Sequence, residues 1–312
     1  MSATTTTTTA TATKAAAAPA PAEAPDRVPR GDVTASLNFY SPPPTGEAPF
    51  NYTDVPPPGE PQRNFSDVVV PVLIRDARSG SGRGNDPTTA FTLDRDAFAI
   101  LRGLPPSAEK AFADDASIER NYYPEVTDLL LANVPGASKV HIFDHTVRRP
   151  GPDAARGPVQ RAHVDQTAAS VEKRVRRYFD GEEADALLSR RYRLINVWRP
   201  LNTGPVESMP LAFASSASVR DGDVVPVEHR YPDGYVGQTA AIRYDEKQEW
   251  YYLSGMTGDE RILLECFDSE SLKAGSGVAG GRVPHSAFAH PRTRDDAVGR
   301  ESIEIRALVF GP

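Results

Sequence analysis

The feature that most constrains the fold of this chain is a series of short strand-like segments that begins near residue 139. They are Lys139 to Val147, the stretch around His163, Arg191 to Trp198, Val236 to Arg243, Glu249 to Ser254, Arg261 to Phe267, Arg282 to Phe288 and Ser302 to Phe310. One helical region, Ser170 to Phe179 and then Glu182 to Arg190, interrupts the series. About eight short strands with few helices predict a mainly β protein, a distorted jelly-roll barrel with helices packed outside it.

Helical signals mark the N-terminal third. Ser117 to Asn133 carries apolar residues at helical spacing, and Ser107 to about Phe112 is predicted as a second helix. Pro-rich turns between Val33 and Pro61 favour an extended arm packed across a sheet. Asp67 to Arg75 is predicted as a strand, and Pro71 within it indicates an edge or a bulge.

The first 30 residues differ in composition from the rest of the chain. Residues 1–30 form a Thr/Ala/Pro tract with scarcely any large apolar residue, so we predict a disordered tail. A targeting peptide is the less favoured alternative, because only Lys14, Arg27 and Arg30 are basic. Residues 31–312 are predicted to form one domain, since a chain of 312 residues with 39% hydrophobic content can bury a substantial core.

Composition excludes several classes of function. The net charge of −7 and the pI near 5.5 argue against a nucleic-acid surface. A single cysteine, Cys266, excludes an internal disulfide framework and a cysteine-rich zinc module. No apolar run approaches the roughly 20 residues that span a bilayer, and Thr4 to Thr13 lacks the apolar character of a signal peptide. We therefore expect a soluble, cytoplasmic protein that acts on a small-molecule substrate, with no nucleic-acid or membrane partner.

The most specific chemical signal is the His-x-Asp motif of His163 and Asp165. In a strand these side chains project from the same face, so an imidazole and a carboxylate converge on one point. His285 lies in a distant strand-like segment and can complete the set from a neighbouring strand. Two histidines and one carboxylate on one face of a metal are the ligands of non-haem Fe(II) oxygenases. The alternative is a hydrogen-bonded core histidine at 163 and a turn residue at 285, and His145 is a second candidate ligand.

Arg300 and Ser302 form another i, i+2 pair at the start of the last strand-like segment. A guanidinium and a hydroxyl on one face can hold a carboxylate together, with the guanidinium binding it through two hydrogen bonds. A dicarboxylic cosubstrate that chelates iron at one end needs such an anchor at the other. Arg292, Arg294 and Arg306 are rival anchors that spacing does not separate. The alternative for Arg300 is a surface ion pair with a nearby carboxylate.

The segment that ends near Trp198 offers candidate substrate-binding residues. Asn196 and Trp198 share one face of the predicted strand, while Arg199 lies on the other. Either Asn196 and Trp198 line the pocket, or Arg199 binds an acidic group of the substrate. Packing of Trp198 in the core is an equally good interpretation.

Four motifs carry a family resemblance. They are His163-Val164-Asp165-Gln166-Thr167, Asn196-Val197-Trp198-Arg199-Pro200-Leu201, Pro284-His285-Ser286-Ala287-Phe288 and Arg300-Glu301-Ser302-Ile303-Glu304-Ile305-Arg306. Together they resemble the AsaB-type hydroxylase/desaturase family, which includes fungal gibberellin desaturase-like enzymes and bacterial cephalosporin methoxylase-like proteins. The resemblance covers roughly Val33 to Phe310 and leaves out the tail.

The resemblance implies a double-stranded β-helix that uses Fe(II), O2 and usually 2-oxoglutarate to oxidise an unactivated C–H bond in specialised metabolism. It implies that His163, Asp165 and His285 bind iron and that Arg300 and Ser302 hold the oxoacid carboxylate. We expect hydroxylation, desaturation or cyclisation of a small carboxylic-acid or amino-acid-derived metabolite. The alternatives are an iron oxidase of the same fold that needs no oxoacid, a zinc hydrolase, since the same ligands also hold zinc, and a non-catalytic ligand-binding barrel.

Overall fold

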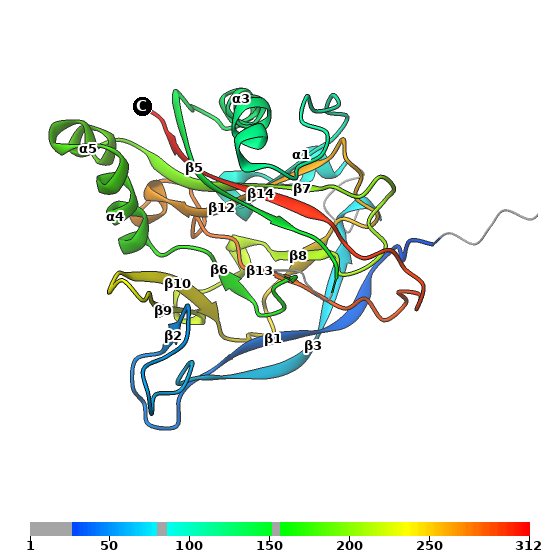
Figure 1. Cartoon of the computed structure of the whole chain (residues 1–312), viewed down its shortest axis with the longest axis horizontal. Coiled ribbons are helices and arrows are strands. Elements are labelled where there is room, and N and C mark those ends of the chain that lie inside the picture. The colour runs from blue at the N-terminus through cyan, green and yellow to red at the C-terminus, as the bar shows by residue number, and fades with distance from the viewer. Residues whose placement is uncertain (1–26, 80–85, 152–156) are drawn as a thin grey trace, which may run out of the picture.

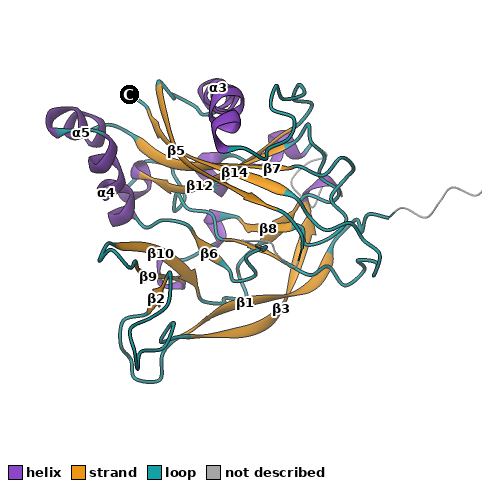
Figure 2. Cartoon of the chain, in the orientation of Figure 1, coloured by secondary structure: helices purple, strands orange, loops and turns teal. Residues whose placement is uncertain are grey.

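Two β-sheets face each other in the computed structural model, which describes residues 27–79, 86–151 and 157–312 (Figure 1). Helices make up a minor part of the described chain and lie outside the space between the sheets (Figure 2). The predicted mainly β fold with flanking helices is confirmed. The predicted tail lies mostly outside the described residues, so the tail and the domain boundary at residue 30 stay predictions.

The elements have the following bounds. The larger sheet contains β1 (Val33–Ser41), β2 (Phe50–Tyr52), β3 (Ser66–Asp76), β6 (His163–Val164), β8 (Leu211–Ala214), β9 (Val224–Arg230), β10 (Val236–Ile242), β11 (Trp250–Tyr252) and β13 (His285–Ala287), in the spatial order β1-β3-β11-β8-β13-β6-β10-β9-β2. The smaller sheet contains β4 (Phe98–Leu101), β5 (Lys139–Arg148), β7 (Tyr192–Pro200), β12 (Arg261–Asp268) and β14 (Ser302–Phe310), in the order β4-β12-β7-β14-β5. The α-helices are α1 (Pro87–Ala90), α2 (Leu93–Asp96), α3 (Asp115–Asn133), α4 (Ala168–Tyr178) and α5 (Gly181–Leu188).

The five-stranded sheet has an apolar outer face and a partly polar inner face. Alternate residues of β7 and β14 pack outward against the apolar side of α3; this cluster includes Ile118, Tyr122, Val126, Leu130, Ile195, Val197, Ile303 and Ile305. Burial of each such side chain contributes about 1.5–3 kcal/mol. Because side chains alternate along a strand, the residues between them face the larger sheet, and they include Asn196, Trp198, Glu304 and Arg306. The packing of α3 therefore fixes which side chains of β7 and β14 point inward.

One of the two helices predicted before residue 134 is present. The helix predicted over Ser117 to Asn133 is confirmed as α3, whose N-cap Asp114 accepts a hydrogen bond from the Ser117 N–H at 2.7 Å. The helix predicted over Ser107 to Phe112 is wrong. There the Glu109 carboxylate accepts hydrogen bonds from the N–H groups of Ala111 and Phe112, at 3.0 and 2.9 Å, and these local bonds replace a helical turn.

The arm predicted between Val33 and Pro61 belongs to the larger sheet instead. β1 pairs with β3 along its full length, from Val33↔Ile74 to Ser41↔Ser66, with no shift in register. The strand predicted around Pro71 is confirmed. It has no bulge there, and β11 pairs with β3 only from Ile74 to Asp76, so the strand is an edge near Pro71. The N-terminal third is therefore richer in strands than predicted, and β8 and β9 were also missed.

The helices of the described residues do not include a membrane-spanning candidate. None of them is both long enough and apolar enough to cross a bilayer.

Candidate metal centre

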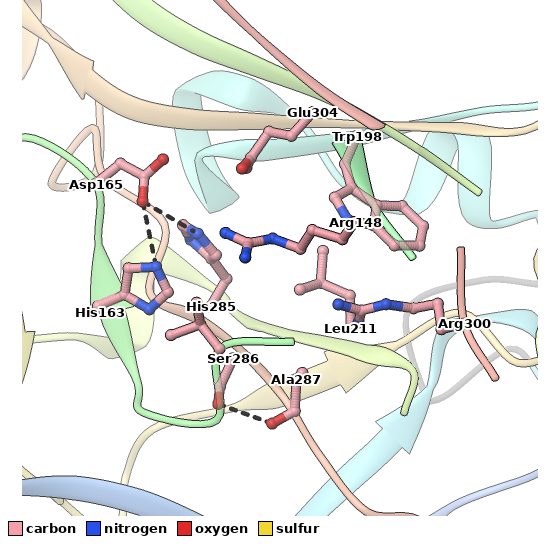
Figure 3. A pocket seen from close by; sticks show the side chains of 11 residues that line it. Arg148, His163, Asp165, Trp198, Leu211, His285, Ser286, Ala287, Arg300 and Glu304 are labelled. Atoms are coloured by element: carbon pink, nitrogen blue, oxygen red, sulfur yellow. Dashed lines mark hydrogen bonds and ion pairs between the residues drawn. The ribbon is translucent and has the colours of Figure 1, made fainter. Parts of the chain in front are cut away.

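The three predicted metal ligands come from two paired strands and the residues that follow one of them. β6 and β13 pair through His163 and His285, whose ring centres are 4.4 Å apart. Oδ1 of Asp165 lies 3.2 Å from Nε2 of His163 and 3.8 Å from Nε2 of His285 (Figure 3). One ligand atom from each side chain lies within 4.8 Å of the other two. The fold thus brings together two imidazoles and one carboxylate that are far apart in the sequence.

Backbone carbonyls orient both imidazole rings. Nδ1 of His163 donates to the carbonyl of Arg161 at 2.7 Å, and Nδ1 of His285 donates to the carbonyl of Val283 at 3.1 Å. Each ring then keeps the lone pair of Nε2 for a metal, which is the usual arrangement of histidine ligands. Burial and the nearby His163 lower the pKa of His285, so its ring is neutral, as ligation requires.

The carboxylate of Asp165 uses its two oxygens differently. Oδ2 accepts hydrogen bonds from Nδ2 of Asn196 at 2.8 Å and from Nε of Arg306 at 3.1 Å, while Oδ1 faces the histidines. Burial acts to raise the pKa of Asp165, but the charge of the Arg306 guanidinium outweighs it and holds the pKa well below its usual range. The group is therefore an oriented, ionised carboxylate with one oxygen available to a cation.

A closed ring of hydrogen bonds supports that carboxylate. Glu304 accepts from Nδ2 of Asn196 at 3.0 Å and from Nη2 of Arg306 at 2.9 Å. Asn196, Arg306, Asp165 and Glu304 thus form one cycle, which we call the β7–β14 ring. Glu304 was missed by the sequence analysis, although the alternation of polar residues from Ser302 to Arg306 could have indicated it.

The ligand cluster lies at one end of a pocket, and Arg300 lines its other side. In Figure 3 the guanidinium of Arg148 and the side chain of Leu211 lie between them, and Trp198 and Glu304 contribute further to the lining. Leu211 and Arg148 were also missed by the sequence analysis, because their role depends on the packing of β8 and β5 around the cluster.

Arg300 is buried with few partners. Its Nη1 donates to the carbonyl of Met209 at 2.6 Å, and its guanidinium carbon lies 5.5 Å from the ring centroid of Trp198. Within the described residues Nε has no hydrogen-bond partner and no carboxylate pairs with the side chain. Burial lowers the pKa of Arg300 to about 10. The desolvation of a buried guanidinium with so few polar partners is unfavourable unless an anion binds to it.

The rival arginines have partners of their own. Arg294 is exposed and bonds to Asp296 at 2.9 Å, and Arg292 donates to the carbonyl of Arg30 at 2.6 Å. Arg306 belongs to the β7–β14 ring. Ser302 is buried in β14 on the same face as Glu304 and therefore faces the pocket side of the sheet.

Two predicted residues lie away from the ligand cluster. Arg199 is on the outer face of β7, with its guanidinium carbon 4.9 Å from the Phe112 ring centroid and 5.4 Å from that of Tyr122. His145 bonds to the hydroxyl of Tyr123 at 2.8 Å and to Asp115 at 3.2 Å, on the side of α3. The sheet separates both residues from the pocket.

Comparison with known proteins gives consistent matches. Residues 37–310 match the family described as "Oxidoreductase/YMDC permease-like domain". The hydroxylase/desaturase poxK of Penicillium oxalicum is 40% identical over 245 residues, which cover 71% of this chain and 75% of that protein. The alpha-ketoglutarate-dependent dioxygenase phiK of a fungal species is 35% identical over 246 residues, which cover 76% of this chain and 84% of that protein. The solved structure of the iron and alpha-ketoglutarate-dependent endoperoxidase NvfI superposes with a TM-score of 0.78 at 30% identity, covering 91% of this chain and 99% of that one.

Proposed function

This chain belongs to the AsaB/poxK-type hydroxylase/desaturase family of Fe(II)- and 2-oxoglutarate-dependent oxygenases, and from that premise we propose that His163, Asp165 and His285 bind its iron. The protein is an oxidoreductase, a dioxygenase that acts on a small-molecule metabolite of specialised metabolism. When bound, Fe(II) and 2-oxoglutarate supply the activation of O2 that breaks a substrate C–H bond. The protein itself supplies ligation, orientation and the pocket.

One observation carries the assignment of the ligands. The three candidate ligand atoms lie within 4.8 Å of one another, and both Nδ1 atoms are already engaged by backbone carbonyls. The donor set of two imidazoles and one carboxylate suits a ferrous ion and leaves other positions open for a cosubstrate. The β7–β14 ring supports the same assignment, because it holds the second oxygen of Asp165 away from the cluster.

Arg300 is the residue we assign to the distal carboxylate of 2-oxoglutarate. It lines the same pocket as the ligand cluster and lacks an ionic partner among the described residues, whereas Arg294 and Arg306 are paired with carboxylates. The guanidinium can bind a carboxylate through two hydrogen bonds, and the Trp198 ring beside it limits its orientation. Ser302 is assigned to the same carboxylate, because its side chain shares the inward face of β14.

Asn196 and Trp198 have different roles in this proposal. Asn196 positions Asp165 and does not contact the substrate, since its Nδ2 bonds to both Asp165 and Glu304. Trp198 forms part of the pocket wall near Arg300, with its ring centroid 5.5 Å from the guanidinium carbon. Arg199 has no part in binding, because it lies on the outer face of the sheet. The choice among hydroxylation, desaturation and cyclisation stays a prediction.

An anaerobic titration tests the proposal. Protein loaded with Fe(II) is titrated with 2-oxoglutarate while the visible charge-transfer band of a chelated oxoacid is recorded. We expect the band in the wild type and in His145→Ala, a histidine control outside the pocket, and its loss in His285→Ala. A wild type that shows neither the band nor 2-oxoglutarate-dependent O2 uptake would overturn the proposal.

A further inference from the structure

His163 and Asp165 also border a second cavity. Its volume is about 230 Å³, and it shares Arg148 and Val159 with the pocket that contains Arg300. Its other walls come from the hairpin of β9 and β10 and from the segment that contains Phe65. The ligand cluster therefore has open space on two sides, one next to Arg300 and one next to β9 and β10.

Strand pairing explains where this second cavity lies. Ala241 of β10 is directly opposite His163 of β6, and Thr239 of β10 is opposite Val227 of β9. Residues two apart on a strand share a face, so Ala241 and Thr239 both lie on the side of His163. The small side chain of Ala241 leaves room beside the imidazole, and Thr239 lies one step farther from the cluster.

The part of the wall away from Arg148 carries no unmatched charge among the residues described. The guanidinium of Arg161 bonds to both oxygens of Asp67, at 2.5 and 2.9 Å, and its carbon lies 5.0 Å from the Phe65 ring centroid. Burial and the nearby His163 lower the pKa of His229, so its ring is neutral. Phe65, Val227 and Ala241 provide apolar surface.

A single polar pair interrupts that apolar surface. Oγ1 of Thr239 lies 3.0 Å from Nε2 of His229, and within the described residues Nδ1 of His229 has no hydrogen-bond partner. A hydroxyl can donate one hydrogen bond and accept two, and a neutral imidazole offers one donor and one acceptor. The pair can therefore bind one more hydroxyl or carbonyl group without any change in charge.

We propose that this cavity binds the substrate and that His229 and Thr239 recognise an uncharged oxygen group, a hydroxyl or a carbonyl, on an otherwise apolar molecule. The inference rests on the proposed function, because it takes the Arg300 side of the cluster as the place of 2-oxoglutarate. It also changes the expected substrate class, from a small carboxylic-acid or amino-acid-derived metabolite to a neutral one.

Selectivity arises because both guanidinium groups that line this cavity have partners: Arg161 is paired with Asp67, and Arg148 donates to the carbonyl of Gly157 at 2.7 Å. A carboxylate would therefore lose hydration without gaining a cation that needs an anion.

Calorimetric titration with two probes tests the inference. The protein is loaded with Fe(II) and saturating 2-oxoglutarate without O2, so that Arg300 is occupied, and is titrated with 1-adamantanol or with 1-adamantanecarboxylate. These probes share a rigid apolar skeleton and differ in charge. We expect the alcohol to bind about tenfold more tightly or better, since a buried carboxylate without a cation costs more than a hydroxyl that is hydrogen-bonded.

Substitutions locate the binding to the polar pair. Thr239→Val and His229→Phe each remove hydrogen-bonding capacity with little change in volume. We expect each substitution to lower the affinity for 1-adamantanol about 3- to 10-fold. Thr34→Val is the matched control, because Thr34 is exposed on β1 and does not line the cavity. Equal or tighter binding of the carboxylate, no binding of the alcohol, or unchanged alcohol affinity in both cavity variants would each overturn the inference.

The oxoacid band recorded in the same samples separates this inference from the proposed function. A wild type with the band but without preference for the alcohol contradicts only the assignment of the substrate cavity. A wild type without the band that still prefers the alcohol contradicts the assignment of 2-oxoglutarate to the Arg300 pocket.

Discussion

The two arginines of this site, the half-buried Arg306 and the buried Arg300, have opposite surroundings. Arg306 bonds to Asp165, Glu304 and Asp144 within 3.3 Å; burial acts to lower its pKa, but these carboxylates raise it above the usual value. Arg300 donates a hydrogen bond to one backbone carbonyl and lies over the ring of Trp198, and burial lowers its pKa to about 10. Carboxylates of the protein surround Arg306, whereas among the described residues none pairs with Arg300, which supports the proposed binding of the 2-oxoglutarate carboxylate at that end.

The largest expected effect is at the Arg306 end, where the proposed metal ligands lie. His163→Ala, Asp165→Ala or His285→Ala removes one of three ligand atoms, and we expect each to abolish iron retention and turnover. Iron content after gel filtration and O2 uptake with 2-oxoglutarate measure the two effects. Full activity in any one variant would contradict the assignment.

Replacement of Arg306 comes next in size. Arg306→Met leaves Asp165 and Glu304 buried without their cation, so we expect a loss of about 3–5 kcal/mol in the free energy of unfolding together with weaker iron binding. Urea denaturation of the metal-free protein measures the first effect. Arg294→Met, which removes an exposed partner of Asp296, is the control and should leave the unfolding midpoint unchanged.

Replacement of Arg300 should leave the stability of the protein intact but weaken the binding of 2-oxoglutarate. Arg300→Met removes an unpaired buried cation, so the free energy of unfolding should stay the same or rise. The affinity for 2-oxoglutarate should fall about 10- to 100-fold, the value of one or two charged hydrogen bonds. The charge-transfer titration measures this. A variant as unstable as Arg306→Met with unchanged 2-oxoglutarate affinity would remove the distinction between the two arginines.

The smallest of these effects concerns Asn196. Asn196→Ala removes one donor that Asp165 and Glu304 share but leaves Arg306 in place, so the ring is weakened rather than broken. We expect about a tenfold loss of iron affinity, the lower part of the range for groups that orient metal ligands. Competition with a chelator measures it. A loss as large as that of Asp165→Ala would mean that Asn196 does more than orient the carboxylate.

Local pattern was enough to predict much of the strand content and to single out the ligand cluster. The spacing of His163 and Asp165 indicates a shared direction on a strand, and His285 is the histidine of a late strand-like segment. The pairing of β6 with β13 that joins them is a property of the whole sheet, which spacing does not contain. His145 was ranked below His285 because no carboxylate stands two positions away from it, and the family resemblance then pointed to His285 as well.

The parts that were missed depend on contacts between distant segments. The β7–β14 ring needs the register in which Arg306 is opposite Asn196, and nothing local to either strand specifies it. The segment from Ser107 to Phe112 has helical composition, yet the Glu109 side chain captures the backbone N–H groups that a helix would use. Arg300 and Arg306 look alike in the sequence, and only their neighbours in the fold distinguish them.

The pairing of β6 with β13 brings His163 and His285 together, so the proposed ligand cluster depends on this pairing. A chain emerging from the ribosome carries His163 and Asp165 long before His285, so an early intermediate offers iron two donors instead of three. On the proposed ligand set, a chain in which β13 has not yet paired with β6 cannot present all three donors to iron.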